Sequence, residues 1–381
     1  MLQSFIVYTG LLITLPFLGH TANQISQRRK QYPSHVYYGF LALIILIFGL
    51  IFGARYKVGI DFMNYKYIYE TIASGHRTQD VLEPGYIIIC ENLGMISNHS
   101  FLFFCFFATL QIWFIIAAFK NKPKLLPWIL LILLSTQFMV MMTLIRQMTF
   151  VCCFIWIITR IDKLSLLKYC LIIGLCAFFF HKSALLMLPL YPLIRYKGNL
   201  CGNHYFQIAI YFFALYIGKS QFVLNKFDDF SSIAILLGYE SYEGAGTMAM
   251  LFMDLNWGPR TYVKFIIVLM SIILSPKVKE YFSDEKILYG RFYNIFFLGV
   301  CAEAILYGID VICRVFLPLY YMKVVINAFT LAYVIYNYKK NFKSLFICTT
   351  FVGLLLIDYT SIFYEVSFPD NTTAFRFFWQ V

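Results

Sequence analysis

Long apolar runs restrict the fold of this chain more than any other feature. Runs such as 2–19, 36–54 and 100–119 carry no charged side chain, and 61% of all residues are hydrophobic. A helix of about 20 such residues crosses the ~30 Å hydrocarbon core of a bilayer. Strands of a membrane barrel would instead alternate in hydrophobicity over shorter segments. The sequence therefore predicts an all-α, polytopic integral membrane protein.

We place about 12 transmembrane helices along the chain, within a range of roughly 10–14. The predicted spans are 2–19, 36–54, 100–119, 125–144, 147–160, 165–181, 183–196, 205–219, 261–275, 292–309, 313–337 and 344–364. Residues 84–97 are apolar but too short to span, which indicates an interfacial or re-entrant helix. We interpret 1–381 as one integral membrane domain, with its larger external segments at about 55–99 and 220–260.

The distribution of lysine and arginine predicts the orientation. One set of short loops is dense in these residues, and dense loops are cytoplasmic under the positive-inside rule. This set comprises Arg28, Arg29, Lys30, Lys120, Lys122, Lys124, Arg160, Lys163, Lys168, Arg195, Lys197, Lys277, Lys279, Lys286, Arg291, Lys339, Lys340 and Lys343. Both termini are then expected outside. The formal net charge of +12 reflects this bias and gives no reason to expect nucleic acid as a partner.

The sequence contains no pattern typical of a metal or nucleotide site. Its 10 cysteines are scattered, mostly inside apolar runs, with no CxxC spacing and no Cys/His ligand set. A glycine-rich phosphate loop is also missing. We therefore expect neither a metal nor a cofactor.

Several ionisable residues lie at the ends of apolar runs that the predicted topology places on the outer face. An ionisable side chain at such a depth is expensive, which makes it a candidate functional residue. The residues are Asp61, Arg146, His181, Arg260, Asp310 and Arg314.

The segment after the second apolar run combines charge, glycine and tyrosine. A helix beginning at Asp61 would place Asp61, Tyr65 and Tyr69 on one face, with Gly59 in the preceding turn and Arg55 before it. Asp61 is expected to cap that helix. Tyrosines in this pattern suit sugar rings, although an aromatic belt at the membrane interface would look the same.

Three further candidates come from short polar interruptions. Glu83 precedes Pro84 and Gly85, which indicates a helix start with a carboxylate aimed at substrate, or a plain helix start. Arg146 offers a planar fork suited to phosphate, or extends to the interface as a structural residue. His181 is a candidate base, or a satisfied structural histidine.

The third group lies near residue 310. Glu303, Tyr307, Asp310 and Arg314 would share one face if a single helix continued through them. Asp310 and Arg314 would then pair, with a purely structural ion pair as the alternative. The external segment 220–260 mixes acidic and aromatic residues and ends at Arg260, a weak indication of carbohydrate contact.

Taken together, these motifs resemble the EpsG family of bacterial membrane proteins, which is grouped with Wzy-type polysaccharide polymerases. They occur in the same order over roughly residues 50–320. The resemblance is carried by Arg55, Gly59, Asp61, Tyr65, Glu83, Gly85, Ile145, Arg146, Gln147, His181, Lys182, Ser183, Asp310 and Arg314.

The resemblance implies a glycosyltransferase of GT-C-like architecture in the bacterial inner (plasma) membrane, with an active site facing the periplasm or exterior. Its substrate would be an oligosaccharide repeat unit on undecaprenyl pyrophosphate, which it would polymerise into O-antigen, capsule or exopolysaccharide. Membrane lipids are expected contacts, and a chain-length regulator is a candidate partner. The sugar–pyrophosphate bond supplies the energy, so no cofactor is needed.

Roles for the residues follow from this chemistry. Guanidiniums stabilise a departing pyrophosphate. We assign this role to Arg146 and Arg314, with Arg55 and Arg260 as secondary candidates. A base must accept the proton of the acceptor hydroxyl; we favour His181, with Asp61 as the rival.

The remaining residues would orient partners or hold sugars. Asp310 would orient Arg314, Tyr65 and Tyr69 would hold sugar rings, and Glu83 would face the substrate.

Other functions remain open at this point. A lipid-linked oligosaccharide flippase would share the substrate but should show repeat symmetry and charges near the membrane midplane. An O-antigen ligase would use the same donor with a different acceptor. An outer-leaflet acyltransferase and a structural scaffold are weaker alternatives.

Overall fold

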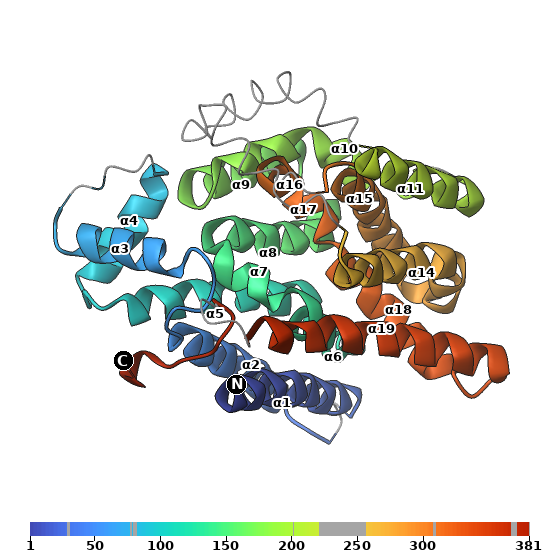
Figure 1. Cartoon of the computed structure of the whole chain (residues 1–381), viewed down its shortest axis with the longest axis horizontal. Helices are drawn as coiled ribbons and strands as arrows, with labels where there is room; N and C mark the ends of the chain where they lie inside the picture. The colour runs from blue at the N-terminus through green and yellow to red at the C-terminus, as the bar shows by residue number, and fades with distance from the viewer. Residues whose placement is uncertain are drawn as a thin grey trace. The chain divides into compact units, whose positions relative to one another are not determined.

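The computed structural model describes residues 1–28, 31–76, 78, 82–200, 202–220, 257–307, 310–366 and 372–380, without the side chains of 310–312 and 365–366. Every regular element in these ranges is a helix, apart from one β-bridge between Arg55 and Phe377 (Figure 1). The chain forms two compact units. Unit 1 holds Met1–Ala184 and Leu355–Val381, and unit 2 holds Leu185–Leu354.

Unit 1 is built from the first nine helices and the C-terminal segment. The helices are α1 (Leu2–Gln27), α2 (Ser34–Gly53), α3 (Phe62–Ala73), α4 (Pro84–Gly94), α5 (Ser100–Phe119), α6 (Leu126–Ile132), α7 (Phe138–Thr143), α8 (Ile145–Arg160) and α9 (Leu166–Phe179). A π-helical turn (Leu133–Gln137) joins α6 to α7, and a 3₁₀ turn (Ile161–Lys163) follows α8. The long apolar helix α5 packs between α2 and α8 and forms the centre of this unit.

Unit 2 begins within a 3₁₀ segment (Lys182–Leu190). Its described helices are α10 (Tyr191–Arg195), α11 (His204–Lys219), α14 (Pro259–Tyr281), α15 (Lys286–Ile305), α16 (Asp310–Val315), α17 (Leu317–Tyr320) and α18 (Lys323–Asn337). A 3₁₀ turn (Ser283–Glu285) precedes α15. The last long helix, α19 (Phe342–Val366), starts in unit 2 and ends in unit 1, and a 3₁₀ turn (Phe378–Gln380) closes the described chain.

The structure confirms an all-α polytopic membrane protein. Seven described helices are long and apolar enough to cross a bilayer. They are Leu2–Gln27, Ser34–Gly53, Ser100–Phe119, Leu126–Thr143, Pro259–Tyr281, Leu317–Asn337 and Phe342–Tyr364. The predicted number of about 12 spans stays a prediction, because the remaining helices are shorter or less apolar.

Three predicted spans differ in the structure, and one of them, 313–337, is divided among α16, α17 and α18. The expected span over 183–196 is a 3₁₀ segment followed by the five-residue α10, since Pro189 and Pro192 each remove a backbone donor. The helix expected over 292–309 ends at Ile305, and a separate helix starts at Asp310. Glu303 and Arg314 therefore do not share one continuous helix.

The C-terminal segment is tied to the residues that follow α2. The amide of Tyr56 donates to the carbonyl of Arg376 at 2.7 Å, and the amide of Gly59 donates to the carbonyl of Thr372 at 2.7 Å. The amide of Phe378 donates back to Ala54 at 3.0 Å. These bonds satisfy backbone groups that no helix uses, and they fix the turn leading into α3.

Candidate functional site

The candidate site of unit 1 gathers at the entrances of three helices: α3, α4 and α8. The turn before α3 needs Gly59, whose φ is +95° and whose missing Cβ would lie 2.8 Å from the carbonyl oxygen of Met142. Only glycine lets the two chain segments approach this closely. Helix α3 then starts directly after Asp61, as the sequence predicted.

Tyr65 and Tyr69 lie on the inner face of α3, one turn apart. Both are buried in an aromatic core cluster, and the ring of Tyr69 packs on Phe103 at 5.2 Å between centroids. The Tyr69 hydroxyl donates to the carbonyl of Ser97 at 2.5 Å. Tyr69 therefore holds α3 against the start of α5 in this structure. The Tyr65 hydroxyl is instead hydrogen-bonded to Arg146.

Glu83 stands at the N-cap position of α4, with Pro84 in the first turn. The backbone of Gly85 lies against α9: a Cβ there would come within 2.8 Å of the Phe178 carbonyl oxygen. This close approach explains the glycine of the Glu83-Pro84-Gly85 motif. It also brings the Glu83 carboxylate to the chain segment that follows α9.

An ion pair joins α4 to α8. Arg146 Nη1 donates to Glu83 Oε2, and the backbone amide of Lys182 donates to Glu83 Oε1 at 3.2 Å. The carboxylate is almost fully buried, while the Arg146 side chain keeps 20% of its surface exposed. A buried carboxylate with a charged partner and a backbone donor is well satisfied, so Glu83 serves to hold the arginine in place.

Two tyrosine rings enclose the Arg146 guanidinium. Its Cζ lies 5.1 Å from the Tyr86 ring centroid and 6.0 Å from that of Tyr65, distances typical of cation–π contacts. Burial raises the pKa of the Tyr65 hydroxyl, and the charge of Arg146 opposes that rise. Among the described residues, no acceptor bonds Arg146 Nε. Nε itself is buried, so the part of the Arg146 side chain open to an anionic ligand is the 20% that remains exposed.

His181 is held by Ser183. The Ser183 amide donates to His181 Nδ1 at 3.2 Å, and the Ser183 hydroxyl lies 2.8 Å from the same nitrogen. A backbone N–H can only donate, so Nδ1 must carry a lone pair. Neutral His181 then has its proton on Nε2, and this nitrogen can donate a hydrogen bond but cannot accept a proton in that tautomer.

Asp61 is half-buried at the N-cap position of α3, yet its side chain makes no capping hydrogen bond there. Its charge acts on the Tyr65 hydroxyl one turn further along the helix. Asp61 is thus near the residue that contacts Arg146.

Arg55 is buried at 3% exposure, and its guanidinium donates to three backbone carbonyls of the described chain. The acceptors are Phe52 at 2.5 Å, Val58 at 3.3 Å and Met142 at 3.3 Å. The Phe104 ring covers it at 4.6 Å. In this conformation Arg55 ties the end of α2 to the end of α7.

The other predicted arginines lie in unit 2. Arg260 is half-buried in the first turn of α14, and half-buried Arg314 lies in the last turn of α16. The side chain of Asp310 lies outside the described residues, as does segment 221–256 of the expected external loop.

Two polar side chains of the predicted 303–314 group have partners within unit 2. Glu303 pairs with Lys323 at 2.8 Å, and the Tyr307 hydroxyl is hydrogen-bonded to Thr261.

Sequence reasoning missed three contributors to the unit 1 site. Tyr86 and Ser183 sit inside motifs that were identified, but their contacts depend on how distant segments pack. The Lys182 amide is a backbone group, which sequence patterns rarely reveal. The partner of Glu303, Lys323, was visible as a lysine inside an apolar run. Among the described residues, no cluster of His, Cys, Asp or Glu could hold a metal ion.

Comparison with protein families supports the motifs. The model of the EpsG family matches residues 38–373, which is almost the whole chain. Neither the curated proteins nor the solved structures compared with the chain gave a significant match. The family match, with the apolar helices, makes this chain a multi-pass membrane protein of the EpsG family, among the polysaccharide polymerases that its motifs indicated.

Proposed function

We propose that the protein polymerises oligosaccharide repeat units carried on undecaprenyl pyrophosphate, at the outer face of the bacterial plasma membrane. The observation that carries this proposal is the arginine of the α4–α8 ion pair in a polysaccharide polymerase family. Glu83 and the tyrosine rings position Arg146, while 20% of its side chain remains exposed. A preorganised guanidinium of this kind stabilises a departing diphosphate.

The reaction transfers the growing glycan from its lipid to a hydroxyl of the incoming repeat unit. The acceptor oxygen forms a bond to the anomeric carbon, the bond from that carbon to the pyrophosphate oxygen breaks, and lipid pyrophosphate leaves with the electron pair. In our proposal Arg146 binds the leaving group. Arg260 and Arg314 remain candidates for further phosphate contacts.

The proton of the acceptor hydroxyl needs a base. The hydrogen bonds of His181 support a donor role for its Nε2–H, directed at the leaving group or a sugar oxygen. Asp61 is the carboxylate one turn before Tyr65 on α3, whereas the Glu83 carboxylate is bonded to Arg146 and Lys182. We therefore assign the base to Asp61 and the hydrogen-bond donor to His181.

The glycan ladder of a deletion strain tests the proposal. Complementation with wild type should restore long chains, whereas Arg146→Ala should leave single repeat units on the lipid. Arg160→Ala, at the other end of α8, is the control and should restore long chains as wild type does. Each variant is quantified in the membrane fraction. If deletion traps the precursor inside the cell, the protein is a flippase. If full-length polymer forms but stays on the carrier lipid, it is a ligase.

A further inference from the structure

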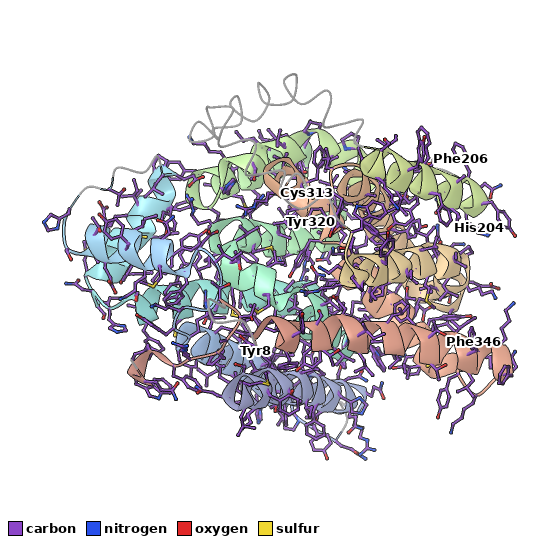
Figure 2. All side chains as sticks on the ribbon, in the orientation of Figure 1. Tyr8, His204, Phe206, Cys313, Tyr320 and Phe346 are labelled. Atoms are coloured by element: carbon purple, nitrogen blue, oxygen red, sulfur yellow. The ribbon has the colours of Figure 1, made fainter. Side chains whose placement is uncertain are left out.

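Unit 2 contains a polar cavity that the proposed function does not use. The cavity, about 340 Å³ in volume, is bordered by the segment before α11, the last turns of α14 and the first turns of α15. This end carries Lys197 after α10, Lys277 near the end of α14 and Lys286 at the start of α15. By the positive-inside rule this end faces the cytoplasm. Figure 2 marks His204, which lines the cavity in the first turn of α11.

Lys279 is the main cation of the cavity. Its Nζ donates to Asn199 Oδ1 at 2.5 Å, which leaves two further N–H groups. The described residues that line the cavity include no aspartate or glutamate, and no described carboxylate pairs with Lys279. Lys286 is near enough to act on Lys279 through its charge. Two like charges near each other favour an anion between them. The acids close to them in sequence, Glu280, Asp284 and Glu285, do not line the cavity.

Other groups in the cavity wall add donors and space. The hydroxyl of Tyr289 is buried and has no hydrogen-bond partner among the described residues. A Cβ added at Gly290 would lie 3.7 Å from Lys279 Nζ, so glycine keeps room beside the ammonium group. A buried hydroxyl without a partner is costly unless a ligand or water satisfies it.

We propose that this cavity binds a phosphate group. Basic pockets between transmembrane helices on the cytoplasmic side take up the headgroups of anionic lipids. The same ammonium and hydroxyl groups would also donate hydrogen bonds to free phosphate. In both cases the phosphate oxygens bind Lys279 and the Tyr289 hydroxyl, and Lys286 adds long-range attraction.

The test uses the purified full-length protein in non-ionic detergent. Native mass spectrometry measures binding of phosphatidylglycerol, with phosphatidylcholine as the lipid without net charge, and a thermal-shift series measures inorganic phosphate. We expect Lys279→Met to weaken binding about tenfold, equivalent to about 1.4 kcal/mol. Lys277→Met removes the same charge from an exposed neighbour in α14 and should bind as wild type does.

A second variant separates binding from misfolding. Gly290→Leu fills the space beside Lys279 Nζ without changing any charge, and it should also weaken binding. Lys279-dependent binding of phosphatidylglycerol alone identifies a lipid headgroup, and Lys279-dependent binding of inorganic phosphate alone identifies a soluble ligand. The proposal is overturned if neither probe depends on Lys279, or if Lys277→Met weakens binding equally.

Discussion

The ion pair between Glu83 and Arg146 allows a quantitative test of the site. Glu83→Ala removes the carboxylate and leaves both Arg146 and the Lys182 amide without their acceptor. Breaking a buried pair from one side costs about 3–5 kcal/mol. We take about 3 kcal/mol, since 20% of the Arg146 side chain is exposed to water.

That cost translates into a measurable shift in melting temperature. For a body of roughly 200 residues such as unit 1, each kcal/mol shifts the melting temperature by about 2–4 °C. Glu83→Ala should therefore melt about 6–12 °C below wild type. Nanodisc-reconstituted protein followed by tryptophan fluorescence or scanning calorimetry provides the assay.

A double-mutant cycle decides whether the two residues act as a pair. Arg146→Ala alone leaves Glu83 with only its backbone donor, whereas the double variant removes both buried charges together. We expect the double variant to be more stable than the sum of the two single losses, by about 0.5–3 kcal/mol. Strictly additive losses would refute the pairing, and with it the argument that Glu83 positions Arg146.

Three further predictions concern neighbouring residues. Gly59→Ala should destabilise the protein by about 1–3 kcal/mol because of its positive φ and the contact with Met142, whereas Gly10→Ala in the open middle of α1 should be neutral or stabilising by melting temperature. His181→Asn keeps an acceptor for the Ser183 amide, so it should fold normally while shortening the glycan ladder. His181→Gln keeps only a donor in place of Nε2–H and should have a lower melting temperature. A full ladder with His181→Asn would remove Nε2 from the mechanism. Arg55→Met should lower the melting temperature by leaving three carbonyls without their donor, yet glycan chain length per folded molecule should stay near wild type.

The sequence was sufficient for long helices such as α2 and α5, because each is defined by its own apolar run. The predicted spans over 36–54 and 100–119 agree with α2 and α5 within a few residues. The prediction of a span over 183–196 was wrong for a local reason. The composition of this segment is apolar, but two prolines interrupt its α-helical hydrogen bonds.

The arrangement around Arg146 could be predicted only in part. Short polar interruptions of the apolar runs indicated Glu83, Arg146 and His181 individually. The structure brings their segments together in unit 1. Their pairing depends on α4 packing against α9, a long-range contact without a periodic signal. Arg55 was a secondary candidate for the same phosphate role as Arg146, and in the structure nearby carbonyls occupy its donors. Only coordinates show this difference between the two environments.

The pairing of the C-terminal segment with residues 54–59 has a consequence for biogenesis. Ribosomes release the chain from its N-terminus, so α1 to α9 are synthesised before Thr372 and Arg376 have been translated. Until then the amides of Tyr56 and Gly59 lack their acceptors, and the turn into α3 is not locked. The turn into α3, the helix that carries Tyr65 beside Arg146, is thus completed only after translation has passed the final helix.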